Sequence, residues 1–299
     1  MSRIQAGAGR IVLRTDGSEA VFTELSCTYP LKLLSPRTSQ QNVRIVYVLT
    51  YGGGLVGGDR IALTAQIEEN TILVMLSQGS TKVFKDRPGE RLSARSHGTH
   101  SAIPTTQRMD ILISSNGALF LLPDPVTCFR AAKYNQLQVF HLHNAASIVL
   151  LDWVTSGRKS IGEEWVFSMY YSLNEVWVDG ERLAKDVMFL QEQDDVQSLP
   201  RRTLANTLAP YSCYATLILY GATVQSSLRH LAAEFEAITV FKHSSPPDLI
   251  WSFSLIREGK GCVVRVAARE TEDVKHWLGG ALKELESVIG VDVYRRAFN

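Results

Sequence analysis

The 299-residue sequence predicts a mostly β fold of the α+β class, with layered β-sheets and two helices near the C-terminus. Three observations predict it. Before residue 190, apolar and polar residues alternate with period two in most segments, which is the pattern of half-buried strands. These segments follow one another too closely for helices to lie between them. After residue 203, apolar residues recur at helical spacing in two segments.

The strands before residue 190 are expected where short runs alternate or are continuously apolar. In chain order they are residues 11–14, 21–29, 44–50, 60–67, 71–76, 109–114, 118–122, 137–143, 147–154 and 164–173. A hairpin is expected around Asp179-Gly180, because Asp-Gly suits a two-residue turn whose central residues both need positive φ. We see no internal sequence repeat among these segments.

The C-terminal part mixes both element types. Strands are expected at residues 215–220, 250–256 and 261–267, and amphipathic helices at 225–238 and 271–289. A polar loop over residues 191–203 separates this part from the strands before it. We therefore expect one domain over 1–299, with a β-rich part at 1–190 and an α+β part at 204–299.

Composition excludes several classes of protein. With 31 basic and 30 acidic residues the formal net charge is +1, so no global field favours nucleic acid or an anionic membrane. No segment approaches the ~20 apolar residues of a membrane span, and the first residues lack a secretory signal, so a cytoplasmic protein is expected. The four cysteines form no C-x-x-C pair and are expected to be buried, reduced thiols: Cys27, Cys128, Cys213 and Cys262.

Five glycines crowd into one short loop after the expected strand 44–50. They are Gly52, Gly53, Gly54, Gly57 and Gly58. Such density indicates a shape requirement, either positive φ or a close backbone approach, and valine at Gly54 or Gly57 is expected to strain the loop. The glycines match G-x-G-x-x-G, but a strand follows them where a dinucleotide site needs a helix. No bound nucleotide is expected.

Two candidate sites have weak signals. His141 and His143 are two apart on an expected strand and could share one metal, although no third ligand stands nearby in the sequence. A hydrolase using Ser80 or Thr81, activated by Lys82 or His141, is an alternative; those hydroxyls equally suit a turn, and the G-x-S-x-G context is missing. A plain β-rich binding scaffold is a further alternative.

Carboxylates recur at expected strand ends: Asp59, Asp124, Asp152, Glu163 and Glu164. Oxygen ligands of this kind suit transient handling of a hard or borderline cation. Considered by itself, Asp59 is expected to be a turn residue whose carboxylate accepts hydrogen bonds from backbone amides.

Four motifs resemble those of a known family, the urease accessory protein UreD, also called UreH. They are GGGLVGGDRI at residues 52–61, SQGSTKVFK at 77–85, LPDPVTCF at 122–129 and DWVTSGRKSIGEEWVF at 152–167. Their order and spacing cover the first two thirds of the chain. The resemblance fades after about residue 190.

The resemblance implies a mostly β, non-catalytic maturation factor. It implies docking on apo-urease together with UreF and the nickel-carrying GTPase UreG, with nickel in transit through an internal tunnel and no tightly bound cofactor. By motif match, the conduit positions are Asp59, Ser80, Asp124, and Glu163 or Glu164. No partner-contact residue is carried over, because the C-terminal part matches weakly.

Overall fold

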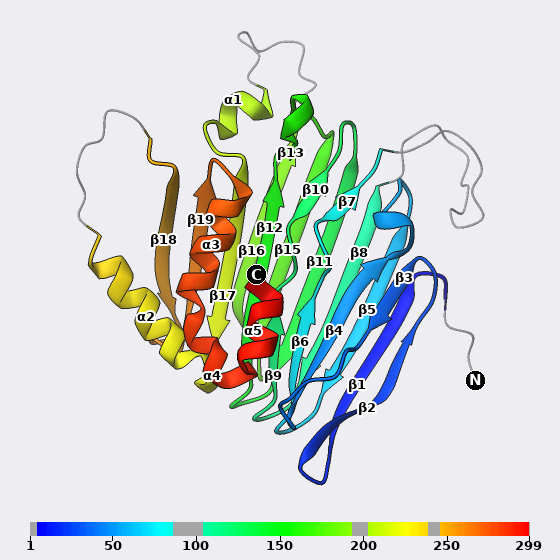
Figure 1. Ribbon diagram of the computed structural model, residues 1–299, viewed down its shortest axis with the longest axis vertical. Helices are drawn as coiled ribbons and strands as arrows, with labels where there is room; N and C mark the ends of the chain where they lie inside the picture. Colours follow the sequence, from blue (N-terminus) through cyan, green and yellow to red (C-terminus); the bar gives the residue numbers. More distant parts are fainter. Residues whose placement is uncertain (1–4, 86–103, 193–202, 239–245, 299) are drawn as a thin grey trace.

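The protein is built as two β-sheets with a layer of helices against the second sheet, as the computed structural model shows (Figure 1). The structure describes residues 5–85, 104–192, 203–238 and 246–298. This arrangement confirms the mostly β fold expected from the sequence. No helix in these ranges is long and apolar enough to cross a bilayer.

The first sheet has seven strands in the spatial order β16-β15-β11-β8-β5-β1-β2. Its strands are β1 (Ala8–Asp16), β2 (Glu19–Cys27), β5 (Arg60–Ile67), β8 (Thr105–Ile113), β11 (Lys133–Leu142), β15 (Met169–Val178) and β16 (Glu181–Gln191). The five inner strands are parallel, and β2 and β16 close the two edges in antiparallel pairs.

The second sheet has ten strands, eight of them in the order β18-β19-β17-β12-β9-β6-β4-β3, with β7 and β10 as a branch on β12. Its strands are β3 (Leu31–Leu34), β4 (Val43–Thr50), β6 (Ile72–Leu76), β7 (Thr81–Val83), β9 (Ala118–Leu121), β10 (Val126–Cys128), β12 (Ser147–Thr155), β17 (Cys213–Tyr220), β18 (Leu249–Ile256) and β19 (Gly261–Ala268). The short strands β13 (Gly157–Arg158) and β14 (Glu163–Glu164) form a separate ribbon.

The chain winds alternately through the two sheets. Three times it leaves a strand of the first sheet and enters the second through a four-residue turn, at residues 68–71, 114–117 and 143–146. The turns stack on one another: Ser114 N donates to Ile67 O at 2.9 Å and His143 N to Ile113 O at 2.9 Å. The same unit of strand, four-residue turn and strand therefore occurs three times, although the sequence shows no repeat.

Each stacked turn has a left-handed residue at its third position. Two of these residues are asparagines, Asn70 (φ 59°) and Asn116 (φ 58°), and the third is Ala145 (φ 64°). Asparagine tolerates this conformation better than alanine. We expect Ala145→Asn to raise the free energy of unfolding by about 0.5–1 kcal/mol, and Asn116→Ala to lower it by a similar amount. Urea unfolding of both variants checks this, and a loss of stability in Ala145→Asn would contradict it.

Two cores hold the layers together. One fills the space between the sheets, and the other lies between the second sheet and the helices. Because β12 lies in the middle of the second sheet and faces both cores, all nine of its residues are buried.

The helices α2, α3 and α5 lie over the outer face of the second sheet (Figure 1). The α-helices are α1 (Leu204–Leu208), α2 (Gln225–Glu236), α3 (Thr271–Ala281), α4 (Glu286–Ile289) and α5 (Val291–Phe298). Short 3-10 turns are η1 (Tyr51–Gly53), η2 (Lys159–Ile161), η3 (Ala222–Val224) and η4 (Lys283–Leu285).

Most expected elements are confirmed, including the hairpin between β15 and β16, where Asp179 (φ 49°) and Gly180 (φ 82°) both have positive φ. Two expectations are wrong. The helix expected over 271–289 ends at Ala281 and continues as η4 and α4. The strand expected over 164–173 is interrupted because Trp165 takes φ 55°, and β15 begins only at Met169.

The cysteine expectation is correct for three residues. All four thiols are free, and Cys128, Cys213 and Cys262 are buried. Cys27 is only partly buried, because it lies at the end of β2 on the edge of the first sheet. Burial raises the pKa of the Cys213 thiol to about 12, and likewise raises the pKa of Cys262 to about 12.

Candidate functional site

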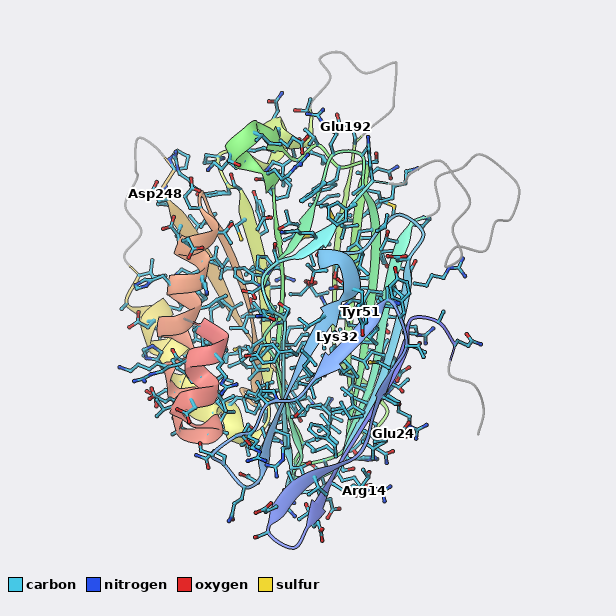
Figure 2. The ribbon with its side chains drawn as sticks, turned by 45° about the vertical axis from the view of Figure 1, so that its right-hand side comes forward. Arg14, Glu24, Lys32, Tyr51, Glu192 and Asp248 are labelled. Atoms are coloured by element: carbon cyan, nitrogen blue, oxygen red, sulfur yellow. The ribbon has the colours of Figure 1, made fainter. Side chains whose placement is uncertain are left out.

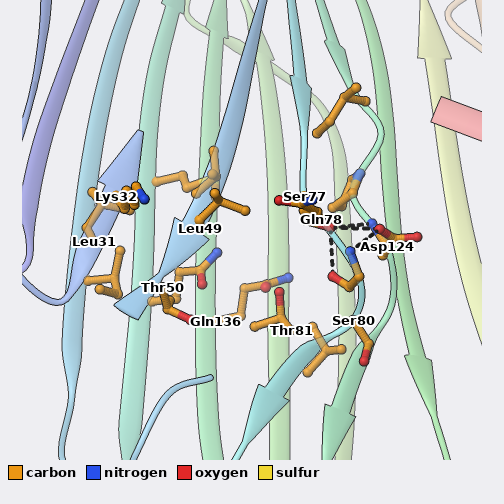
Figure 3. Close-up of a pocket in the computed structure, with 18 of the residues that line it drawn as sticks. Leu31, Lys32, Leu49, Thr50, Ser77, Gln78, Ser80, Thr81, Asp124 and Gln136 are labelled. Atoms are coloured by element: carbon orange, nitrogen blue, oxygen red, sulfur yellow. Dashed lines mark hydrogen bonds between the residues drawn. The ribbon is translucent and has the colours of Figure 1, made fainter. Parts of the chain in front are cut away.

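A cavity of about 360 Å³ opens beside the glycine loop and reaches between the two sheets. Its mouth is formed by η1 and by the loop that leads into β7. Its inner wall includes Gln136, which is labelled in Figure 3, together with Gln138 and Asp152. Lys32 and Tyr51 meet at the rim, with the ammonium 5.6 Å from the ring centre (Figure 2). The cavity thus joins the surface to the space between the sheets.

The glycine loop is attached to the strand that borders this mouth. Leu55 N donates to Lys82 O at 2.8 Å, and Leu55 O accepts from Phe84 N at 2.8 Å. A Cβ on Gly54 would lie 2.6 Å from the carbonyl oxygen of Lys82, so only glycine fits there. The chain can therefore approach β7 closely enough to form these two bonds.

Backbone strain is distributed differently from the sequence-based expectation. Positive φ occurs at Gly52 (77°), Gly53 (75°) and Gly58 (85°). Gly54 has φ 163°, which any residue adopts, and Gly57 is not among the positive-φ glycines. The expectation that valine at Gly54 or Gly57 is strained by a positive φ is therefore wrong. At Gly54 a larger side chain is excluded by the close approach of Lys82 O.

Asp124 fixes the loop on the other side of the mouth. Its Oδ2 accepts from Gly79 N at 2.9 Å and from Ser77 Oγ at 3.3 Å, while Asp124 N donates back to Ser77 Oγ at 2.7 Å (Figure 3). Ser80 lines the cavity next to this loop. Two of the predicted conduit residues, Ser80 and Asp124, are therefore brought together at the mouth.

Asp152 lies at the inner end of the cavity, in the middle of β12. It accepts hydrogen bonds from Ser172 Oγ (2.6 Å), Asn174 Nδ2 (2.7 Å) and Gln136 Nε2 (3.0 Å). Burial raises the pKa of its carboxyl group above the ordinary value, and the three donors oppose that rise. A carboxylate is thus held between two β-sheets whose contacts are otherwise mainly apolar.

The register of the strands extends this polar cluster into two rows that face each other. Neighbours across β11, β15 and β16 are Gln138, Asn174 and Asp186. Neighbours across β12, β17 and β19 are Asp152, Thr216 and Arg265. The rows meet at the Asn174–Asp152 bond and at an ion pair in which Arg265 Nη2 lies 2.7 Å from Asp186 Oδ1. We call these six residues the polar layer.

The far end of the polar layer reaches a second opening. Asp186, Thr216 and Arg265 line a cavity of about 340 Å³ whose other walls include residues of β16, β17, β18 and β19. Two acceptor atoms within the layer, Gln138 Oε1 and Asn174 Oδ1, are buried and have no hydrogen-bond partner among the described residues. Buried polar oxygens in proteins are ordinarily hydrogen-bonded to protein groups or to ordered water, so both atoms can still accept a hydrogen bond.

Three predicted conduit residues lie elsewhere, each held by its own hydrogen bonds. Asp59 Oδ2 accepts from Val56 N at 2.8 Å within the turn that ends the glycine loop, which is the turn role that its sequence context suggests. Glu164 Oε2 accepts from Ser212 Oγ at 2.9 Å. None of these carboxylates, nor Glu163, lines the first cavity.

Glu163 is bound by two guanidinium groups. Arg158 Nη2 lies 2.6 Å from its Oε2, and Arg130 Nε lies 3.1 Å from its Oε1. These hydrogen bonds, that of Arg158 above all, hold the pKa of Glu163 below its ordinary value. The carboxylate thus ties the β13–β14 ribbon to the loop after β10.

The weak metal candidates do not form a common site. His141 Nε2 lies 3.8 Å from Asp110 Oδ1, and His143 Nδ1 lies 3.8 Å from Asp179 Oδ1, with both imidazoles about half exposed. Nowhere in the described ranges do three His, Cys, Asp or Glu side chains gather as metal ligands do. His141 also lies on the solvent face of the first sheet, remote from the interior cavity that Ser80 lines.

Sequence reasoning missed most of the polar layer. Three of its members, Gln138, Asn174 and Asp186, are buried although they are polar, and so are the neighbouring Gln136 and Ser172. A signal was present: Gln136 and Gln138 stand two apart on β11, and Ser172 and Asn174 stand two apart on β15, so each pair shares one face of its strand. That periodicity marks a polar stripe, but does not say that the stripe faces inward.

Comparisons with known proteins agree with the motifs. The profile of the UreD urease accessory protein family matches residues 5–297, well past residue 190, where the motif resemblance fades. Urease accessory protein 4 of Cryptococcus neoformans is 40% identical over 292 residues, covering 92% of this chain and 89% of the relative. Urease accessory protein D of Arabidopsis thaliana is 34% identical, covering 96% and 99%.

A third relative is similar over nearly the whole of this chain. Urease accessory protein UreD of Sorangium cellulosum is 32% identical, covering 98% of this chain and 84% of the relative. The family match spans both sheets and the helices, so the motifs and the C-terminal part belong to one family pattern. This chain therefore belongs to the UreD family of urease accessory proteins, which are non-catalytic factors in the maturation of urease.

Proposed function

We propose that this chain docks on apo-urease together with UreF and UreG, and that nickel passes through it along the polar layer. The observation that carries the proposal is a row of buried carboxylate and amide groups between two openings. A β-sandwich gains nothing in stability from a buried acid, because moving a charge out of water is costly. We therefore explain the buried carboxylates by the nickel ion that they would bind in transit.

The chemistry of the layer suits transit of a divalent cation. Carboxylate and amide oxygens bind Ni²⁺ less tightly than a closed set of imidazole and thiolate ligands would. Asp152 already accepts three hydrogen bonds, and the unpartnered Gln138 Oε1 and Asn174 Oδ1 can hold water around a moving ion. Exchange between such ligands is expected to be faster than release from a structural metal site.

The residues divide into two roles in this proposal. Asp124, Asp152 and Asp186 face the path, with Asp124 at the first opening and Asp186 at the second. Ser80 adds a hydroxyl at the mouth. Asp59, Glu163 and Glu164 hold surrounding turns and strands, so they act on the path through its walls.

Nickel loading of urease tests the proposal. Asp124→Asn and Asp186→Asn are expected to lower the nickel content of activated urease while apo-urease, UreF and UreG still co-purify with the chain. The matched control is Asp16→Asn, because Asp16 is an exposed carboxylate at the end of β1. Variants of Asp59, Glu163 and Glu164 are tested for nickel loading of urease in the same way. Equal loading by wild type and all conduit variants would leave a docking scaffold without a passage.

A further inference from the structure

A third cavity, of about 450 Å³, lies on the other side of Ser80 and has a different chemistry from the polar layer. Its walls carry the cations Lys82, Arg158 and Lys159, and several hydroxyl groups. We propose that this cavity binds a phosphate group, and we call it the phosphate cavity. The proposal is independent of nickel transit.

Positive charge exceeds negative charge around the phosphate cavity. Glu163 is shared between Arg158 and Arg130, and Lys159 is paired with Glu270. Lys82 is exposed, and no described carboxylate lies within 4 Å of its ammonium group. Among the residues that line the cavity, the three cations outnumber the one carboxylate, Glu270, so positive charge is left to attract an anion.

The hydroxyl groups supply directed donors. Thr127 Oγ1 and Thr155 Oγ1 lie 2.9 Å apart, and only one can donate to the other, so one hydroxyl hydrogen is left over. Ser156 is 2% exposed and its backbone is fully used, with N donating to Ser212 O and O accepting from Trp165 N. Ser156 also lines the cavity, so its side-chain hydroxyl is a further donor beside the two threonines.

Backbone amides add to these donors. Helix α3 begins at Thr271 on the wall of the cavity, and the residue before it, Glu270, makes no side-chain cap. The first amides of a helix have no partner within the helix and are common ligands of phosphate oxygens. Cations, hydroxyl groups and a helix N-terminus at one cavity match the several acceptor oxygens of a phosphate group better than the two of a carboxylate.

Because the cavity also has a carboxylate, that of Glu270, two substitutions are expected to change phosphate affinity in opposite directions. This carboxylate lines the cavity, so it opposes an anion and would favour a cation. Lys82→Gln is expected to weaken phosphate binding roughly fivefold, and Glu270→Gln to strengthen it by a similar factor. Both side chains are exposed, so neither change should disturb the fold.

Titration of the purified full-length chain with inorganic phosphate and, separately, with a nucleoside triphosphate measures both effects by calorimetry at constant ionic strength. Tighter binding of the triphosphate would identify the source as a nucleotide, and equal or tighter binding of inorganic phosphate would identify the free anion. Arg108→Gln is the control, since Arg108 is an exposed cation on β8, outside the cavity. Absence of saturable binding of both ligands, or equal affinities in wild type and the Lys82 and Glu270 variants, would overturn the proposal.

Discussion

Asp152→Asn is expected to lower nickel delivery to urease on the order of tenfold, because it replaces one ligand oxygen of the central acid of the proposed path with an amide NH₂ that cannot bind a cation. At neutral pH it is also expected to stabilise the fold. Burial raises the pKa of Asp152, so the ionised carboxylate is disfavoured in the folded protein relative to the unfolded chain. An asparagine carries no such cost.

The pH dependence of this gain has a defined sign. Between the ordinary pKa of aspartate, about 3.9, and the raised folded value, the folded protein holds a proton that the unfolded chain lacks. The free energy of unfolding of the wild type therefore falls as pH rises through that window. The advantage of Asp152→Asn should be largest at neutral pH and should shrink as pH falls toward the unfolded value.

Hydrogen bonding permits this substitution. The amide of Asn174 can turn so that its unpartnered Oδ1 accepts from the new asparagine Nδ2. Urea unfolding at several pH values and nickel analysis of the activated urease measure the two effects. A variant that is less stable at neutral pH, or that delivers nickel as well as wild type, would contradict the role assigned to Asp152.

Gly54→Ala is expected to destabilise the protein by about 1–3 kcal/mol, because a Cβ would lie 2.6 Å from both Lys82 O and Phe84 Cε2. The glycine loop must then move away from β7 and lose its two backbone bonds through Leu55. The mouth of the first cavity would change with it, so nickel delivery should also fall. Circular dichroism during urea unfolding gives the change in stability.

Gly280→Ala provides a control of opposite sign. Gly280 lies in α3, and nothing lies within 4 Å of the position its Cβ would take. Alanine is favoured over glycine in a helix by roughly 0.5–1 kcal/mol, so this variant should be more stable. Equal unfolding midpoints for Gly54→Ala and wild type would show that the loop can shift without cost.

Local patterns predicted most elements of this fold because they depend on neighbouring residues. The turn at Asp179-Gly180 and the strands with period two are of this kind. The order of strands in each sheet depends on contacts between distant segments, and periodicity holds no information about them. The positive φ of Trp165 also depends on contacts with a distant segment. The side chain of Trp165 is buried, and its indole N–H donates to Tyr211 O at 3.2 Å, 46 residues away.

Strand β11 shows why the candidate site was predicted only in part. Hydrophobicity alone would turn Leu137 and Val139 toward the core, yet both lie on the half-exposed face. Gln136 and Gln138 point inward instead, because partners on β12 and β15 satisfy or surround them. The motifs that carry the family resemblance gave Asp124 and Ser80 at the mouth, but the interior of the path lies mostly outside those motifs.

The alternating course of the chain also decides when the polar layer can exist during synthesis. Asp152 emerges from the ribosome before Ser172 and Asn174, its two partners on β15, and before Asp186 on β16. Parallel strands of the first sheet can be added one after another in the order of translation, from β5 to β8 to β11. A nascent chain that ends before Met169 therefore contains the entrance residues, the central acid and Gln138 of the opposite row, but it lacks Asn174, Asp186 and the far opening.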